Sequence, residues 1–181
     1  MAELRSPPSG AGDPGLFSYP QVVHLLTVEF ARARRYEYPL SCLLLRVDGL
    51  ETLRDLHGHR ARDLVRERAM ALVRRESRSC DFLGRFPDDR LLVVLPHTDL
   101  DGAHALAERV RACLAALEVD VEGGRPFRAT ASLGVSCYRD RNTLFYDALV
   151  FAAEEALREA ASLGGNRVVA RDPRPVGGEG P

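Results

Sequence analysis

Residues 78–96 read Arg-Ser-Cys-Asp-Phe-Leu-Gly-Arg-Phe-Pro-Asp-Asp-Arg-Leu-Leu-Val-Val-Leu-Pro. Two runs of strand length, 80–86 and 90–95, flank an acidic Pro-Asp-Asp segment whose residue types favour a tight turn. The stretch therefore predicts a β-hairpin, and an Arg-x-x-Asp segment, Arg78 to Asp81, stands directly before its first strand.

The chain on either side of this hairpin alternates between helical and strand-like patterns. Residues 40–47 form a continuous apolar run bounded by Pro39 and Gly49, which is typical of a strand buried on both faces. Apolar residues recur at helical spacing in several other segments, and the remaining expected elements are helices at 22–35, 61–75, 100–117 and 144–163, a short helix or turn at 48–56 closed by His57-Gly58-His59, and strands at 127–136 and 168–170. This order predicts an α/β (α+β) fold with a ferredoxin-like βαββαβ core, in which helices flank a mixed central sheet.

Length and composition limit the possible classes of protein. The 181 residues suffice for one domain, and the Pro- and Gly-rich segments 1–15 and 172–181 are expected to be disordered tails around a domain at 16–171. The net charge is −1, so we expect neither a nucleic-acid nor a membrane-surface partner. All 25 basic residues are arginines, whose planar guanidinium groups suit phosphates and guanine edges.

The cysteine pattern and the absence of long apolar runs indicate a reduced, cytoplasmic protein. The four cysteines are widely spaced, with no Cys-x-x-Cys pair and no Cys/His cluster, which argues against a zinc site or a disulfide framework. No apolar run approaches the 18 residues or so of a membrane span, and no signal peptide is evident. His57, His59, His97 and His104 lack partners at metal-ligand spacing.

Four segments together carry a family resemblance. They are Val47-Asp48 with Gly58-His59 and Asp63, then Arg85-Phe86 with residues 92–96, then residues 131–135 (Ala-Ser-Leu-Gly-Val), and finally residues 163–168 (Leu-Gly-Gly-Asn-Arg-Val). In this order they resemble the landmarks of the GGDEF domain of diguanylate cyclases over residues 16–171, which implies a nucleotide-cyclase-like fold. Each segment is weak alone, and the match is specific because all four occur at matching spacings.

The resemblance also implies what stands at the catalytic positions. Diguanylate cyclases join two GTP molecules, and divalent metal ions neutralise the charge as each 3′-hydroxyl attacks the other α-phosphate. Arg46 stands at a metal-ligand position of the first strand, and Arg54 and Asp63 stand at the guanine-reading pair. The catalytic turn is occupied by Pro87, Asp88, Asp89 and Arg90, and Leu91 follows it. A cation at Arg46 repels a metal ion, and Pro87 replaces a glycine and removes an N–H. We therefore expect a degenerate active site with no catalytic residue, no cofactor and no bound metal. We expect Asp63 and Asp89 to serve a solvated helix face and a turn.

The same resemblance implies a second family site, the product-binding inhibitory site, whose key positions are retained here. Its Arg-x-x-Asp core corresponds to Arg78 and Asp81, an arginine from the following helix corresponds to Arg109, and an arginine from a neighbouring protomer's first helix corresponds to Arg32. These residues are the expected ligands of cyclic di-GMP, because arginine pairs with guanine edges and phosphates and aspartate accepts from guanine N–H groups. The residues alone also allow a simpler interpretation, in which Arg78–Asp81 is a surface ion pair and Arg109 pairs with Glu108 or Asp101.

The sequence thus predicts a catalytically inactive GGDEF domain that acts as a cyclic di-GMP receptor and signals through contacts with an unidentified protein, with a homodimer possible. Two alternatives stay open. One is a ligand-independent interaction scaffold on a GGDEF fold. The other is a protein with residual GTP binding or weak diguanylate cyclase activity, against which Arg46 and Arg90 argue.

Overall fold

The computed structural model describes residues 16–121, 126–139, 143 and 145–174. The tail expected at 1–15 and residues 175–181 of the tail expected at 172–181 therefore lie outside the described residues. Within the described part, four helices and seven strands follow one another. They are α1 (Tyr19–Tyr36), β1 (Leu40–Val47), α2 (Leu50–Glu76), β2 (Phe82–Phe86), β3 (Arg90–Pro96), α3 (Leu100–Ala115), β4 (Glu118–Val119), β5 (Phe127–Arg128), β6 (Ala131–Tyr138), α4 (Tyr146–Ser162) and β7 (Val168–Ala170).

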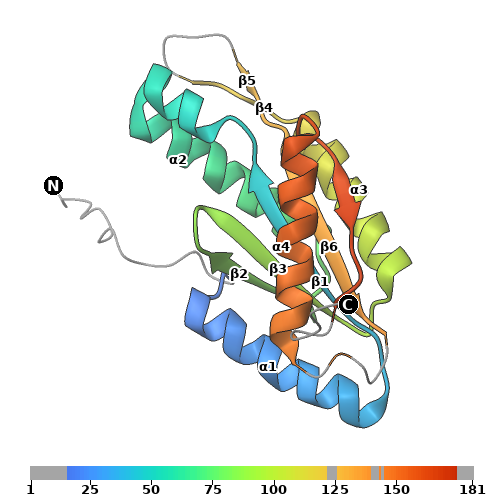
Figure 1. Cartoon of the computed structure of the whole chain (residues 1–181). Helices are drawn as coiled ribbons and strands as arrows, with labels where there is room; N and C mark the ends of the chain where they lie inside the picture. Colours follow the sequence, from blue (N-terminus) through green and yellow to red (C-terminus); the bar gives the residue numbers. More distant parts are fainter. Residues whose placement is uncertain (1–15, 122–125, 140–142, 144, 175–181) are drawn as a thin grey trace, which may run out of the picture.

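Five strands form one mixed sheet in the order β2-β3-β1-β6-β7. Strand β1 is antiparallel to both of its neighbours, and its Leu43 lies opposite Val93 of β3 and Val135 of β6. Strand β7 runs parallel to β6. Helices α1 and α4 pack on one face of the sheet and α2 and α3 on the other (Figure 1). The predicted ferredoxin-like core with flanking helices is therefore confirmed.

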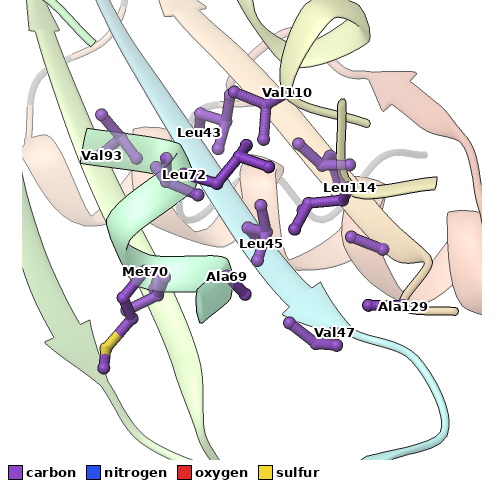
Figure 2. Close-up of a cluster of buried hydrophobic side chains, with 14 of the residues drawn as sticks. Leu43, Leu45, Val47, Ala69, Met70, Leu72, Val93, Val110, Leu114 and Ala129 are labelled. Carbon is purple, nitrogen blue, oxygen red and sulfur yellow. The ribbon is translucent and has the colours of Figure 1, made fainter. Parts of the chain in front are cut away.

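The two faces of β1 belong to two different hydrophobic cores. Leu43 and Leu45 point into the core beneath α2 and α3 (Figure 2), whereas Cys42 and Leu44 contribute to the core beneath α1 and α4. Because successive side chains of a strand point to opposite faces, a strand covered on both sides must be apolar at nearly every position. This explains the continuous apolar run from which the strand was predicted, and its bounds are as predicted.

Helix α4 sits unusually close to the sheet because β6 has a glycine beneath it. A Cβ on Gly134 would lie 2.1 Å from the carbonyl oxygen of Ala153 and 2.4 Å from the backbone nitrogen of Leu157. Only a residue without a side chain fits such an approach. Gly134 belongs to the Ser-Leu-Gly segment noted in the sequence, and its role here is packing.

Helix α2 and the segment 127–136 are each divided into two pieces. Helix α2 contains Gly58 with a non-helical backbone (φ 81°, ψ 175°), which separates two helical pieces as the His57-Gly58-His59 segment predicted. The single strand expected at 127–136 is wrong, because Phe127 and Arg128 pair with β4 in a separate two-stranded sheet and β6 begins only at Ala131. A short apolar run does not reveal which partner each half selects.

The described residues agree with two further expectations. All four cysteines are free thiols, and Cys42 and Cys137 are buried in the sheet. None of the helices in the described ranges is both long enough and apolar enough to cross a lipid bilayer.

Candidate functional site

Strand β2 carries a loop at each end, and these two loops hold five of the eleven predicted site residues. Residues 78–81, called the Arg-x-x-Asp turn below, precede the strand, and residues 87–89, called the hairpin turn, follow it. A strand rises about 3.3 Å per residue, so the five residues of β2 separate the two loops by roughly 17 Å. The two predicted sites are therefore distinct places on the molecule.

The hairpin turn closes without either glycine of the family motif. Asp88 and Asp89 both adopt the left-handed region, with φ of 60° and 55°. Aspartate tolerates that region better than most residues that carry a side chain. The N–H of Arg90 donates to the carbonyl oxygen of Pro87 at 3.4 Å, which completes the turn.

The carboxylate of Asp89 is held by two arginines that lie one helical turn apart on α2. Arg62 donates to Oδ2 of Asp89, and Arg66 donates to Oδ1 at 3.2 Å. The side chain of Asp89 is 31% exposed, compared with 86% for Asp88 beside it. Burial raises the pKa of Asp89, but the two guanidinium groups outweigh that effect and hold the pKa below its ordinary value. The hydrogen bond from Arg62 to Asp89 in turn raises the pKa of Arg62.

Arg90 turns toward α4. Its Nη1 donates to Oε1 of Glu154 at 2.8 Å, and its Nε donates to the carbonyl oxygen of Pro87 at 2.8 Å. The guanidinium carbon also lies 4.8 Å from the centre of the Phe86 ring, a cation–π geometry. Arg90 thus fastens the base of the hairpin to α4.

A pocket of about 690 Å³, called the turn pocket, lies beside the hairpin turn and the end of β1. Three of the residues predicted at degenerate active-site positions, Arg46, Asp88 and Asp89, line it. Asp48, Ala161 and Gly165 line it as well. The structure therefore brings the end of β1, the hairpin turn and the loop after α4 around one space.

Both oxygens of the Asp48 carboxylate are already engaged. Ser132 donates to Oδ1 at 2.8 Å, while Thr130 and the N–H of Asn166 donate to Oδ2 at 2.9 and 3.0 Å. These contacts fasten the end of β1 to β6 and to the loop after α4. Asp48 is a structural residue in this arrangement.

The two remaining predicted active-site residues lie on α2 outside the turn pocket. Arg54 pairs with Glu51 at 2.5 Å and with Asp55 at 3.0 Å. Asp63 is 46% exposed and lies 3.4 Å from Arg66. In the described part of the chain, no three His, Cys, Asp or Glu side chains are placed together so as to hold a metal ion.

The Arg-x-x-Asp turn is organised by backbone hydrogen bonds. The N–H of Arg78 donates to Oδ2 of Asp81 at 2.7 Å, and the N–H of Asp81 donates to the carbonyl oxygen of Arg78 at 3.1 Å. Arg78 is exposed, and Asp81 is half-buried. Burial raises the pKa of Asp81, although the N–H and the charge of Arg78 oppose that shift. The turn is thus fixed by its main chain, which leaves the Arg78 guanidinium exposed to solvent.

Arg109 reaches the same corner of the molecule from α3. Its Nε donates to Oε2 of Glu76 at 3.0 Å, and its Nη2 donates to the Glu76 carbonyl oxygen at 3.0 Å. Glu76 is the last residue of α2, two positions before Arg78, and its pKa is lowered by hydrogen bonds from Arg75 and Arg109. The alternative pairing of Arg109 with Glu108 or Asp101 is wrong, because Arg109 donates to Glu76 of α2 and Glu108 accepts from Arg111 instead.

Arg32 lies on the other side of the sheet from Arg109. Its Nη1 donates to Oε1 of the buried Glu29 at 2.6 Å, and 60% of its side chain is exposed. Helix α1, which carries Arg32, and helix α3, which carries Arg109, cover opposite faces (Figure 1). The Arg-x-x-Asp turn stands at the edge of the sheet between them, so Arg78, Asp81 and Arg109 share one corner and Arg32 approaches it from the opposite face.

Several residues that shape these sites escaped the sequence analysis. Arg62, Arg66, Glu29 and Glu154 each hold a predicted site residue through its charge. The spacing of Arg62 and Arg66 does place both on one side of a helix. No local pattern indicates that this side faces the hairpin turn.

Comparisons with known proteins agree with this architecture. The family model described as diguanylate cyclase, GGDEF domain, matches residues 16–167. Diguanylate cyclase A of Treponema denticola is 30% identical over 146 residues, which cover 80% of this chain and 38% of that protein. Diguanylate cyclase DgcP of Pseudomonas aeruginosa is 31% identical over 143 residues, which cover 79% of this chain and 21% of that protein. The chain therefore spans well under half the length of these relatives.

Solved structures show the same fold. Diguanylate cyclase SiaD of Pseudomonas aeruginosa, in complex with its activator SiaC, superposes with a TM-score of 0.81 at 30% identity, over 88% of this chain and 61% of that one. The GGDEF domain of DgcB from Caulobacter crescentus, in complex with c-di-GMP, gives 0.81 at 17% identity, over 92% and 98% of the two chains, and this likeness concerns the fold alone. The family model covers most of the chain, and the sheet order, the turns and the relatives all agree with it. This chain therefore belongs to the GGDEF domain family of diguanylate cyclases.

Proposed function

We propose that this domain is a cyclic di-GMP receptor without cyclase activity. The observation that carries the proposal is the contrast between the two ends of β2. At one end the acidic hairpin turn is neutralised by Arg62 and Arg66, and at the other end Arg78 and Asp81 stay accessible beside Arg109.

The donor set around the hairpin turn does not suit a divalent cation. Such an ion needs several oxygen ligands with uncommitted lone pairs, and carboxylates supply most of them in nucleotide enzymes. Each oxygen of Asp89 already accepts from an arginine, and each oxygen of Asp48 accepts from β6 or its neighbours. Arg46 adds a positive charge to the same pocket.

The Arg-x-x-Asp turn, in contrast, presents groups that match guanine. The fork of Arg78 can donate two hydrogen bonds to O6 and N7 of a guanine or to a phosphate. Oδ2 of Asp81 accepts a hydrogen bond from the N–H of Arg78. Among the described residues, Oδ1 accepts only from the Cys80 thiol, at 4.0 Å. Oδ1 therefore has the capacity to accept from guanine N1–H and N2–H₂, donors that adenine lacks.

Arg109 would supply the second cation of the site. Its hydrogen bonds to Glu76 hold the guanidinium beside the turn, yet 53% of the side chain is exposed. Cyclic di-GMP carries two phosphates, so two fixed arginines at one corner complement its charge. Glu76 would act as a positioning residue, because it contacts Arg109 and lies next to the turn.

The signal would leave the domain through contacts with another protein or a second copy of the chain. A ligand seated at this corner would contact α2 and α3, which pack on each other, and the first residues of β2, which packs against α1 and β3. Binding would thereby fix their relative position at the surface, which is a difference that a partner can read.

Isothermal titration with cyclic di-GMP tests the proposal. We expect binding at micromolar concentration or tighter, abolished in Arg78→Ala and strongly weakened in Asp81→Asn. Arg68→Ala is the matched control, because it removes an equally exposed arginine of α2. Cyclic di-AMP should not bind, since adenine lacks the adjacent N1–H and N2–H₂ donors of guanine that Asp81 would accept from.

The same preparation distinguishes the alternatives. No heat at saturating cyclic di-GMP overturns the receptor proposal and supports the ligand-independent scaffold. Conversion of GTP with magnesium into cyclic di-GMP, lost in Asp89→Asn, overturns the claim of inactivity.

A further inference from the structure

A second pocket, called the α1 pocket, lies between the C-terminal half of α1 and the edge of the sheet. Its volume is about 520 Å³. Residues that line it include Glu29, Arg32, Tyr36, Tyr38, Cys80 and His97. It lies away from the turn pocket, and none of the active-site positions discussed above lines it.

The pocket has aromatic walls. The rings of Tyr38 and His97 are stacked, with centroids 3.8 Å apart and planes at 28°. Tyr36 adds a third ring that is 65% exposed. Exposed aromatic rings around a cavity are typical of sites that accept a flat ligand, because every nucleobase has a π face that can stack on them.

A buried carboxylate holds two of these walls in place. Glu29 is 7% exposed, and it accepts from Nη1 of Arg32 at 2.6 Å and from the hydroxyl of Tyr38 at 3.0 Å. Burial and the hydrogen bond to Glu29 raise the pKa of Tyr38 to about 12, so its hydroxyl is a donor under all ordinary conditions. Arg32 keeps its remaining guanidinium donors for a partner, because one nitrogen satisfies Glu29 and most of the side chain faces solvent.

The α1 pocket borders the Arg-x-x-Asp turn at Cys80. Cys80, which lines the pocket, lies between Arg78 and Asp81 in that turn. A ligand held by Arg78 and Asp81 therefore has this aromatic cavity as its immediate neighbour on the α1 side. The cavity is also chemically complementary to a guanine of a cyclic dinucleotide. Its rings can stack on the base, and its arginine can donate to the O6 and N7 edge of the base.

We propose that one guanine base of a cyclic dinucleotide occupies the α1 pocket, stacked on its tyrosine rings, with Arg32 of the same chain on the edge of the base. This inference rests on the proposed function and extends it by giving Arg32 a role within one protomer. Arg78, Asp81 and Arg109 hold the second half of the ligand, and Glu29 is a positioning residue for Arg32 and Tyr38.

Calorimetric titration of the full chain with cyclic di-GMP tests the pocket. Truncating an aromatic ring that stacks on a base typically weakens binding by about tenfold. We expect that loss in Tyr36→Ala, whose exposed ring contributes little to the fold, and a similar loss in Arg32→Ala. Phe151→Ala is the matched control, since it removes a comparably exposed ring from α4 (53%) and should leave the affinity unchanged. Far-ultraviolet circular dichroism and the thermal midpoint verify that each variant is folded.

The outcomes separate this inference from the function on which it rests. Binding by the wild type that is lost in Arg78→Ala but unchanged in Tyr36→Ala and Arg32→Ala overturns the α1 pocket and leaves the receptor intact. Silence of the wild-type protein overturns both. Weakening in Tyr36→Ala and Arg32→Ala, with none in Phe151→Ala, supports the pocket.

Discussion

The ion-pair cluster of the hairpin turn leads to a quantitative prediction for Asp89→Asn. Each oxygen of Asp89 accepts a hydrogen bond from a guanidinium group, and two thirds of the side chain is shielded from solvent. Hydrogen bonds to charged groups contribute about 1.5–3 kcal/mol, and partial exposure favours the lower part of that range. The change also removes the carboxylate charge shared by Arg62 and Arg66, whose Nε atoms are buried without a partner among the described residues. Arg66 then keeps Asp63, at 3.4 Å, as an anionic neighbour.

We therefore expect Asp89→Asn to lower the free energy of unfolding by about 2 kcal/mol and the thermal midpoint by roughly 4–8 °C. Urea unfolding and calorimetry at pH 7 measure both quantities. The control is Asp88→Asn, a neighbour in the same left-handed conformation that is 86% exposed, and it should change stability by less than about 0.5 kcal/mol.

The pH dependence gives an independent check on the same pair. The pKa of Asp89 in the folded state lies below its ordinary value of 3.8. Its stabilisation is thus fully present above pH 3.8 and is lost as the pH falls through the lower folded-state pKa. The wild type and Asp89→Asn should differ at pH 7 and converge in acid. Equal stability of Asp89→Asn and Asp88→Asn at pH 7 would refute the view that the arginines neutralise this turn.

Three further predictions concern other parts of the structure. Gly134→Ala should lower the free energy of unfolding in urea by about 3 kcal/mol, because the new Cβ meets the backbone oxygen of Ala153, which cannot move aside as a side chain can. A loss of stability below about 1 kcal/mol would contradict the packing described. Glu29→Gln should lower the pKa of Tyr38 from about 12 in a tyrosinate absorbance titration and leave it above the ordinary 10.0, because burial, the largest cause of the shift, stays while the charged acceptor and its repulsion are removed. An unchanged titration would show that burial alone sets the pKa. The affinity for cyclic di-GMP should fall on acidification, and the fall should begin at a higher pH than for a site with an ordinary aspartate. The reason is that the pKa of Asp81 is raised and its carboxylate must be ionised to accept two N–H groups. The same pH profile in Asp81→Asn would contradict that role.

Sequence patterns predicted the elements of the fold well because those elements are defined by local periodicity and burial. The apolar run of β1 and the helical spacing of α1 identify both elements, and Gly58 marks the break within α2. Residues 127–136 were harder, since Phe127 and Arg128 leave the main sheet to pair with β4. That choice depends on which distant strand is available, and the local sequence does not encode it.

The site followed the same division between local and distant information. The position of the Arg-x-x-Asp turn and the Pro87-Asp88 pair in the hairpin turn can be read from neighbouring residues. The ion pairs that decide the electrostatics join residues far apart in the chain, such as Arg62 with Asp89 and Arg109 with Glu76. In a chain with 25 arginines, a sequence offers many equivalent pairings, and only the packing of α2 against the hairpin and against α3 selects among them.

The most direct test of the account compares cyclic di-GMP titrations of the wild type and Arg78→Ala, performed under identical conditions in the presence of magnesium. The account predicts saturable binding to the wild type, none to Arg78→Ala, and no consumption of GTP by either protein. Equal binding by the two proteins, or wild-type binding that is abolished by Asp89→Asn instead, would place the ligand at the hairpin turn and contradict the central claim.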